Sequence, residues 1–315
     1  MKVLVTGASG FIGHALVPRL IKAGHEVVTS SRHANSGPIG TTVHPIADLG
    51  PDTDWSEALF EVEAVIHLAA RVHIMTDKAQ DPLADNRRIN TEGTRKLAKD
   101  AATAGVRHFI FMSTIKVNGE SSGLKPFCAH DLPAPKDPYA IAKLEAEEAL
   151  KELSNRTKME IVIIRSPLIY GEGVKGNFLR LLELSNKGIP LPLLNIKNTR
   201  SLVGIDNLID LISCCIDHPK AASQTFLVSD NENISTTELI KKIKIAMGKS
   251  LRLFPIPLIL FKPLGHLIGK SSEVNRLFSS LTINISHTCN QLNWKPKFSL
   301  DYGLKKTVNW YLKNL

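Results

Sequence analysis

Short apolar runs rich in β-branched residues alternate with segments of helical periodicity through the first half of the chain. The runs predict β-strands, and the segments between them predict crossover helices that return the chain to parallel strands. We expect helices over residues 11–23, about 81–104 and 138 to about 153. The expected strands have the sequences KVLVT, EVVTS, TVHPI, AVIHLAA, HFIFMST and EIVIIRS. The pattern predicts an α/β fold built on a doubly wound parallel sheet.

The alternation becomes less regular after the sixth strand. We expect a helix over residues 177–187, an amphipathic helix over 199–215, and then a strand, TFLVS, that adds to the same sheet. These elements predict one large unit and a smaller, discontinuous α+β unit. The large unit would contain residues 1–166 and about 201–230, the smaller one about 167–200 and 231–297, and a C-terminal helix would span 298–315.

The composition is that of a globular protein from a reducing compartment. With 315 residues, 43% of them hydrophobic, the chain can bury a core larger than that of one average domain. Its four cysteines show neither a disulfide framework nor metal-ligand spacing, so we expect no metal. The most apolar run, LFPIPLILF, contains two prolines and is far shorter than the ~20 residues that cross a bilayer. The first residues enter glycine-rich sequence without a signal-like apolar stretch, and we expect a cytoplasmic location.

The net charge of +9 is concentrated in the C-terminal quarter. Residues 241–315 hold thirteen Lys or Arg against Glu273 and Asp301, a balance of +11, which leaves −2 for the rest of the chain. Basic residues in this number either face solvent without a partner or attract an anionic partner. No nucleic-acid-binding motif is present, so no nucleic-acid partner is expected. An alternative is peripheral docking on an anionic membrane through the apolar, proline-broken stretch at 254–268.

Three glycines follow the first predicted strand at the start of the first predicted helix. Gly7, Gly10 and Gly13 have the spacing G-x-x-G-x-x-G. Glycine allows a tight turn and a close approach of the backbone to a pyrophosphate. The helix N-terminus adds free N–H groups and the positive end of its dipole. The strand, the turn and the helix together predict a dinucleotide-binding Rossmann fold.

This spacing and seven later motifs resemble the extended short-chain dehydrogenase/reductase family, in its NAD-dependent nucleotide-sugar epimerase and reductase branch. The resemblance covers nearly the whole chain, and the order of eight motifs is more specific than any one of them. It implies a nicotinamide cofactor in the large unit, a UDP-sugar in the smaller unit and a homodimer through the long helices. The motifs are TGASGFIG, ADL, HLAA, NTEGT, STIKVNG, YAIAK, RSPLIYG and RSLVGIDNL.

The resemblance also implies which residues surround the cofactor. Asp48 and Leu49 would border the adenine, Ala69 and Ala70 would flank the cofactor, and Asn90 would be a structural residue behind the site. Simple packing explains Ala69 and Asn90 as well as ligand contact does. The implied cofactor-binding residues are Gly7, Gly10, Phe11, Ile12, Gly13, Ser31, Arg32, Asp48, Leu49, Leu68, Ala69, Ala70, Ser113, Tyr139 and Lys143.

Tyr139 and Lys143 lie four residues apart, so a helix would place them on one face. Tyr302 and Lys306 have the same spacing, which shows that spacing alone does not identify a site. A tyrosine, with a pKa near ~10, exchanges protons at neutral pH only when a cation stabilises its phenolate, and Lys143 supplies one. By the resemblance Tyr139 exchanges a proton with the sugar and Lys143 also holds the nicotinamide ribose. Thr114 would donate a hydrogen bond to the reacting oxygen and complete the implied catalytic set.

The two residues after Thr114 narrow the reaction. The dehydratase branch has an Asp–Glu pair there, and the enzymes that act at C3 and C5 have a cysteine first, whereas this chain has Ile115 and Lys116. Redox chemistry at one sugar carbon, C4, remains, and Asn118 in place of the tyrosine of VYG marks a sub-branch. Similarity to surface-polysaccharide enzymes favours reduction of a UDP-4-keto-6-deoxy-hexosamine. The alternatives are 4-epimerisation of UDP-glucose or UDP-N-acetylglucosamine and, more remotely, non-catalytic NADP(H) sensing.

The two phosphates of a nucleotide sugar favour arginines at the lip of the smaller unit. Arg200 opens RSLVGIDNL, where the family binds the diphosphate, and Arg276 is the second candidate. Asn177 matches a family asparagine that contacts the substrate. With Thr114 and Lys116, these residues form the predicted substrate-binding set. A surface ion pair is the alternative for both arginines.

The second predicted strand ends in Ser31 and Arg32, where an acidic residue would bind the ribose hydroxyls of NAD. Ser31 removes repulsion of a 2′-phosphate, and Arg32 offers a cation, so the sequence predicts a preference for NADP(H), with NAD(H) as the alternative. Exchangeable NADPH suits net reduction, whereas an epimerase recycles one bound NAD. A loop arginine that faces solvent is the alternative for Arg32.

Overall fold

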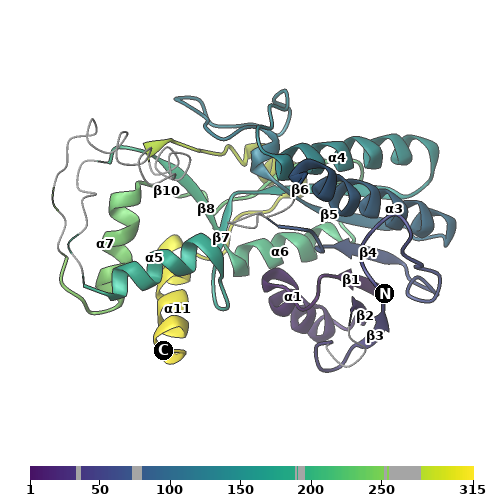
Figure 1. The fold of residues 1–315 in the computed structure, drawn as a ribbon, viewed down its shortest axis with the longest axis horizontal. Coiled ribbons are helices and arrows are strands. Elements are labelled where there is room, and N and C mark those ends of the chain that lie inside the picture. Colours follow the sequence, from purple (N-terminus) through teal and green to yellow (C-terminus); the bar gives the residue numbers. More distant parts are fainter. Residues whose placement is uncertain (33–36, 73–79, 189, 191–195, 252–253, 255–277) are drawn as a thin grey trace.

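The computed structural model describes residues 1–32, 37–72, 80–188, 190, 196–251, 254 and 278–315. Its largest feature is a seven-stranded parallel sheet in the order β3-β2-β1-β4-β5-β6-β9 (Figure 1). The strand order reverses between β1 and β4, and the carboxyl ends of strands at such a point form the ligand crevice of doubly wound sheets. The predicted fold class is confirmed. The strands are β1 (Lys2–Thr6), β2 (Glu26–Ser31), β3 (Thr42–Pro45), β4 (Ala64–His67), β5 (His108–Thr114), β6 (Glu160–Ser166) and β9 (Thr225–Leu227).

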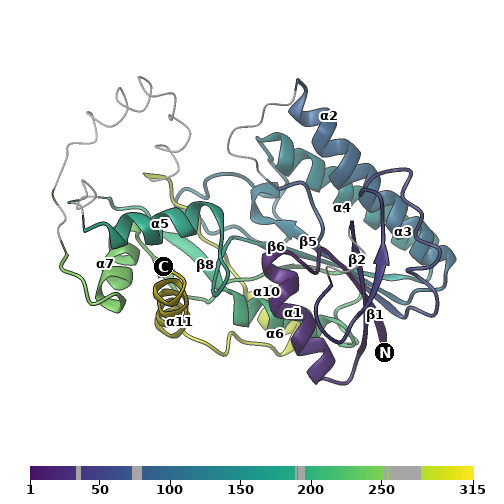
Figure 2. The ribbon, with the colours of Figure 1, turned by 60° about the horizontal axis from the view of Figure 1, so that its bottom comes forward.

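Helices cover both faces of this sheet (Figures 1 and 2). α1 and α6 pack against each other on one face, and α3 and α4 on the other. Alternate residues of a strand point to opposite faces, so Ile110 and Met112 of β5 join the core beneath α1 and α6. Phe109 and Phe111 join the core beneath α3 and α4. Burial on both faces explains why the strands are almost continuously apolar. The helices are α1 (Phe11–Lys22), α3 (Gly93–Thr103), α4 (Pro138–Arg156) and α6 (Ile205–Cys215).

The segment predicted as one helix over 81–104 contains a π-helical stretch. Asp81 caps α2 (Pro82–Asn86), because its carboxylate accepts two backbone N–H groups of the first turn at 3.0 Å. The chain continues through the π-helical η1 (Arg87–Glu92) into α3. Such π-helical turns occur often beside functional sites. Here the π turn carries Asn90, whose contacts lie at the end of β4.

A second sheet has the strand order β10-β8-β7, with β8 parallel to β7 and antiparallel to β10. Three helices pack with it into a core that includes Tyr170, Phe178, Leu202, Ile243 and Leu304. Figure 1 shows this smaller unit beside the large sheet, with α11 below its strands. Its elements are β7 (Leu168–Tyr170), α5 (Gly176–Asn186), β8 (Arg200–Gly204), β10 (Asn233–Ile234), α7 (Thr236–Ala246) and α11 (Leu300–Lys313), and the short α10 (Ser286–Leu292) packs against the large sheet.

The predicted amphipathic helix over 199–215 is wrong at its start. Residues 200–204 form β8, and α6 begins only at Ile205, after Gly204 with its extended backbone. RSLVG forms a strand because it has β7 and β10 as hydrogen-bonding neighbours. The strand predicted as TFLVS is present as β9, paired with β6. The division into domains stays a prediction, which we now refine by placing β8 in the smaller unit.

Within the described part of the chain, no helix combines the length and the hydropathy needed to span a membrane. The stretch at 254–268 that suggests membrane docking lies outside the described residues, apart from Phe254.

Candidate functional site

The loop between β1 and α1 leaves no room for side chains at its glycines. Gly7 has a φ of +71°, and a Cβ there would lie 2.7 Å from the backbone nitrogen of Ala69. A Cβ on Gly13 would lie 2.4 Å from the carbonyl oxygen of Gly7. The backbone N–H of Gly10 donates to that same oxygen at 2.9 Å. The loop, the start of α1 and the end of β4 are thus packed backbone against backbone.

The N-terminus of α1 fits an anion. Gly10 precedes the helix without a side-chain cap, and the first turn of this fully described helix holds no acidic residue. The first N–H groups of a helix have no partner within it and carry the positive end of the dipole. Phe11 and Ile12 are half-buried and pack against the core, which fixes the helix start on the sheet. A glycine cradle beside an uncapped helix start fits the pyrophosphate of a dinucleotide.

Polar side chains hold the segment that follows β4. The backbone N–H of Ala69 donates to Thr6 Oγ1 at 3.2 Å. The Asn90 carboxamide accepts from the backbone N–H of Arg71 at 2.8 Å and donates to the carbonyl oxygen of the same residue at 3.0 Å. These bonds give Asn90 the structural role that the resemblance implies. They also fix residues 68–70, Leu68 to Ala70, against the glycine loop.

Asp48 and Arg32 lie at the edge of the sheet formed by β2 and β3. The Arg88 guanidinium donates to Asp48 Oδ2 at 2.8 Å, and this bond lowers the pKa of the Asp48 carboxyl, with a smaller contribution from the charge of Arg32. Arg32 is exposed directly after Ser31, the last residue of β2. Leu49 is buried in the core beneath α3. A cation therefore stands where the sequence predicts one, and its contact with a cofactor stays a prediction.

Lys143 is buried in the middle of the candidate site and is only 1% exposed. Its ammonium group donates to the carbonyl oxygen of Met112 at 2.9 Å and lies 4.3 Å from the centroid of the Phe111 ring. Burial lowers the pKa of Lys143 to about 7, against the opposing effect of the Glu147 carboxylate. At neutral pH the amine is therefore divided between its charged and neutral forms.

Tyr139 lies in the first turn of α4, which Asp137 caps by accepting a backbone N–H at 2.7 Å. Burial raises the pKa of the Tyr139 hydroxyl, and the Asp137 carboxylate raises it further. Thr114 ends β5 and begins the 3-10 turn η2 (Ile115–Val117), where its Oγ1 accepts from the backbone N–H of Lys116 at 3.3 Å. β5 and η2 both contact α4, so the three predicted catalytic residues lie on adjoining elements.

A buried polar network lies behind Lys143. The Glu147 carboxylate accepts from Ser113 Oγ at 2.5 Å and from Arg165 Nη2 at 2.6 Å. Arg165 also donates to Asn118 Oδ1 at 2.9 Å. The Glu147 and Arg165 side chains are 0% and 2% exposed. The Ser113 side chain is therefore turned toward Glu147, and its predicted contact with the cofactor stays a prediction.

The predicted substrate-binding residues lie on separate elements. Lys116 of η2 forms an ion pair with Asp137. Arg200 begins β8 and donates to a backbone carbonyl oxygen at 3.1 Å. Asn177 is exposed in the first turn of α5, and Arg276 lies outside the described residues. The two described cations have protein partners in this structure, so their contact with a substrate stays a prediction.

Comparison with known proteins identifies the family. A model of the NAD dependent epimerase/dehydratase family matches residues 3–229. The chain belongs to this family. A similar member is the UDP-glucose 4-epimerase of Vibrio cholerae, 45% identical over 314 residues that cover 99% of this chain and 95% of that protein. A UDP-glucose 4-epimerase of Mycolicibacterium smegmatis is 30% identical, with 99% and 98% of the two chains covered.

Solved structures agree with this fold. The UDP-glucuronic acid 4-epimerase from Bacillus cereus, in complex with NAD, matches with a TM-score of 0.80 at 23% identity over 100% of this chain and 99% of that one. The UDP-glucose 4-epimerase of Thermotoga maritima, with UDP-glucose, matches with a TM-score of 0.79 at 23% identity and the same coverage. The predicted family is confirmed, and the protein is an enzyme of the NAD-dependent epimerase/dehydratase family with a nicotinamide cofactor.

Three residues that hold the site in place were not predicted as site residues from the sequence. Asp137 carried a local signal, because an acidic residue directly before a proline is typical of a helix start. Glu147 follows Lys143 by four residues, which places both on one helix face. Arg165 opens the motif RSPLIYG, but no local pattern indicated its partner, because Glu147 lies 18 residues away on another element.

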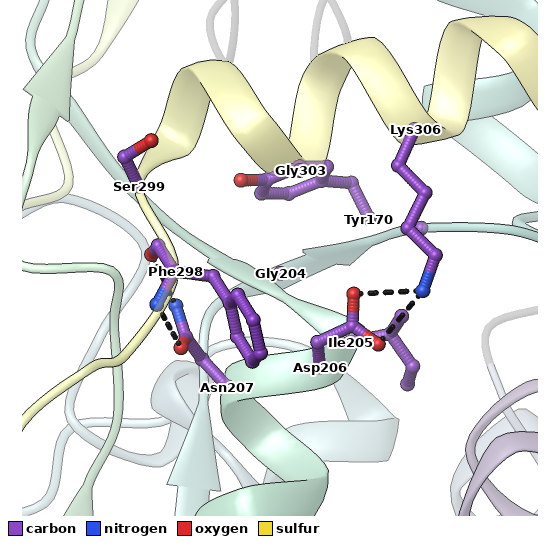
Figure 3. Close-up of a pocket in the computed structure, with 10 residues that line it drawn as sticks. Tyr170, Gly204, Ile205, Asp206, Asn207, Phe298, Ser299, Gly303 and Lys306 are labelled. Carbon is purple, nitrogen blue, oxygen red and sulfur yellow. Dashed lines mark hydrogen bonds and ion pairs between the residues drawn. The ribbon is translucent and has the colours of Figure 1, made fainter.

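A small cavity of about 10 Å³ lies apart from these residues, between the second sheet, α6 and α11 (Figure 3). Tyr170 Oη donates to the Asp230 carboxylate at 2.7 Å, and Asn207 Nδ2 donates to the same carboxylate at 2.7 Å. Lys306 pairs with Asp206 at 2.9 Å beside them. None of the predicted site residues that the structure describes lines the cavity, whose volume suits about one water molecule. It is a packing feature that joins α11 to the second sheet.

Proposed function

We propose that this protein is a UDP-hexose 4-epimerase, with UDP-glucose and UDP-galactose as its substrates. The observation that carries the proposal is the full-length similarity to the Vibrio cholerae UDP-glucose 4-epimerase, at 45% identity. The placement of Tyr139 and Lys143 on α4, beside the strand that ends in Thr114, supports it. Because of this similarity, we place 4-epimerisation ahead of the 4-keto reduction that the sequence motifs favour.

Each residue of the site has a role in this reaction. The glycine loop and the start of α1 would bind the NAD pyrophosphate, and bound NAD supplies the hydride acceptor and donor. Tyr139 Oη would take the proton of the sugar 4-hydroxyl as C4 gives up its hydride, and would return that proton to the same oxygen when, after the sugar turns, hydride comes back to the opposite face of C4. Thr114 Oγ1 would donate a hydrogen bond to the same sugar oxygen. Lys143 in its charged form would stabilise the tyrosine phenolate and so make the proton transfer reversible.

Interconversion of the two sugars tests the proposal. The NAD-loaded protein is incubated with UDP-glucose and, separately, with UDP-galactose, and both nucleotide sugars are quantified over time. We expect the same final mixture from either side, with no net consumption of cofactor. The opposite outcome is no interconversion of these sugars together with stoichiometric oxidation of NADPH by a UDP-4-keto-6-deoxy-hexosamine.

Reduction of such a 4-keto sugar is the second candidate, and one observation favours it. Arg32 is exposed at the end of β2, and Ser31 stands where an acid would repel a 2′-phosphate. In an enzyme that exchanges NADPH at each turnover, the Arg32 cation would attract the 2′-phosphate of the cofactor. Binding of NADPH and NADH to the wild type and to Arg32→Ala tests the point. An unchanged NADPH-to-NADH preference in the variant would remove this support.

Three further predictions from the sequence concern substrate contacts, oligomeric state and location. Asn177, Arg200 and Lys116 would contact the substrate, the protein would be a homodimer, and its location would be cytoplasmic. Light scattering on the purified protein measures the oligomeric state directly, and a monomeric mass would contradict the homodimer.

A further inference from the structure

Lys116 and Asp137 form an ion pair between the η2 turn and the start of α4. Their side chains are 24% and 14% exposed, so the pair is partly shielded from water. Asp137 Oδ1 accepts from the backbone N–H of Ala140 at 2.7 Å, and the backbone N–H of Lys116 donates to Thr114 Oγ1 at 3.3 Å. The pair therefore ties the turn after Thr114 to the helix turn that carries Tyr139.

The charge of Asp137 opposes ionisation of Tyr139. The carboxylate lies two residues before the tyrosine and raises the pKa of its hydroxyl, in addition to the effect of burial. On the same helix Lys143 follows one turn later, and its charge favours the phenolate. On η2, the element that packs against this turn, Lys116 is the charged group, and its ammonium contacts Asp137.

Charged groups farther into the core have partners or are neutral. Glu147 is paired with Arg165, with 2.6 Å between Oε2 and Nη2. His67 of β4 interacts with Lys143, but burial lowers the pKa of His67 to about 3, so the ring is uncharged at neutral pH. Among the described residues, Asp137 is thus a negative group that acts on Tyr139, and Lys116 is a counter-charge of Asp137.

We propose that Lys116 and Asp137 act together as positioning residues for Tyr139. Asp137 fixes the start of the helix that carries the tyrosine, and Lys116 cancels the carboxylate charge that would otherwise oppose formation of the phenolate. This inference rests on the proposed function in one respect, namely that Tyr139 exchanges a proton with the sugar. It gives Lys116 a task within the protein in addition to the substrate contact that the sequence predicts.

Titration of Tyr139 in the NAD-loaded protein tests the inference without any turnover. Tyrosinate absorbance is measured against pH as the difference between each protein and its Tyr139→Phe counterpart. We expect Lys116→Met to move the midpoint up by about one pH unit, since an adjacent carboxylate is then uncompensated. Asp137→Asn keeps an oxygen for the helix cap but removes the charge, so the midpoint should move down. The double variant should return close to the wild-type midpoint.

Two controls separate charge from general disturbance. Lys96→Met removes the cation of a pair with Asp100 on α3 that is also partly shielded, with side chains 35% and 27% exposed, and should leave the midpoint unchanged. Lys116→Arg keeps the charge and should retain the wild-type midpoint. Coincident midpoints in all variants, or a shift in the same direction for Lys116→Met and Asp137→Asn, would overturn the inference. The two midpoints could also shift in opposite directions in a protein that does not interconvert UDP-glucose and UDP-galactose. That outcome would support the positioning role of Lys116 and Asp137 and reject the proposed function.

Discussion

Tyr139 and Tyr302 each precede a lysine by four residues, but their surroundings differ. Tyr302 is 48% exposed on α11, and Lys306 is paired with Asp206. We expect Tyr139→Phe to lower turnover of UDP-glucose about 100- to 10,000-fold, the usual effect of losing a general acid–base group, with NAD still bound. Tyr302→Phe should leave turnover unchanged. An equal loss in both variants would remove Tyr139 from the mechanism.

Burial of Lys143 predicts a pH dependence of stability. Burial lowers the pKa of Lys143 to about 7 in the folded protein, whereas an unfolded lysine has a pKa of about 10.4. Between these values the unfolded chain binds more protons, so the free energy of unfolding rises with pH. We expect the wild type to gain up to about 2 kcal/mol relative to Lys143→Met between pH 7 and pH 9 in the cofactor-free protein. Denaturant unfolding at several pH values measures the difference, and parallel pH profiles would contradict it.

At the residue scale, the sequence predicts the groups that belong to contiguous motifs. Gly7 and Tyr139 are examples, because the strand, turn and helix around each are encoded locally. The partner of Lys116 could not be predicted in the same way, since Asp137 lies 21 residues away on another element. Contacts of that kind depend on the packing of η2 against α4, which no local pattern specifies.

The link between β1 and α1 predicts a steric effect on cofactor binding. A Cβ on Gly13 would lie 2.4 Å from the Gly7 carbonyl oxygen and 2.5 Å from Ala8 Cα, so Gly13→Ala must displace the loop. We expect NAD affinity, measured by calorimetry, to fall at least about tenfold, since the loop amides then lose their alignment with the pyrophosphate. Gly24, which follows the other end of α1, has a φ of +85° and open space around its Cβ position. Gly24→Ala should cost about 1 kcal/mol of stability without changing NAD affinity, and weakened binding there would contradict the steric explanation.

Two ion pairs of the α4 helix, one buried and one exposed, predict different stability effects. Glu147 and Arg165 are 0% and 2% exposed, so Glu147→Gln leaves a buried guanidinium without its counter-charge and should cost about 3–5 kcal/mol. Glu152 and Arg156 are 62% and 74% exposed, and Glu152→Gln should cost less than about 1 kcal/mol. Chemical denaturation of both variants measures the difference, and a loss for Glu147→Gln as small as that expected for Glu152→Gln would contradict a structural role of Glu147.

At the element scale, the periodic pattern predicts the strands of the large sheet closely. β1, Lys2–Thr6, coincides with the predicted KVLVT, because a strand buried on both faces is a short apolar run with clear ends. The exception is β8. Its apolar residues continue into α6 without a break in hydropathy, and its partners β7 and β10 lie far along the chain, so a local pattern could not separate the strand from the helix.

In the folded molecule, ion pairs neutralise part of the positive charge of the C-terminal quarter. Lys297 pairs with Asp210 at 2.7 Å and Lys306 with Asp206 at 2.9 Å, so acids from the middle of the chain offset these cations. The charge balance along the sequence therefore overstates the basic surface that an anionic partner would meet. Composition could not show this, because it carries no information about which distant segments pack together.

Asn207 joins three distant segments of the chain. Its amide nitrogen donates to Asp230 at 2.7 Å and to the carbonyl oxygen of Phe298 at 2.8 Å, partners that lie 23 and 91 residues away. Because loops of that length must close before these bonds can form, we expect the cluster to form after the rate-limiting barrier of folding. Its hydrogen bonds then act on the lifetime of the native state rather than on the speed of folding. Asn207→Ala should accelerate unfolding in stopped-flow experiments while the refolding rate stays nearly constant, and slowed refolding would place the cluster in the folding nucleus.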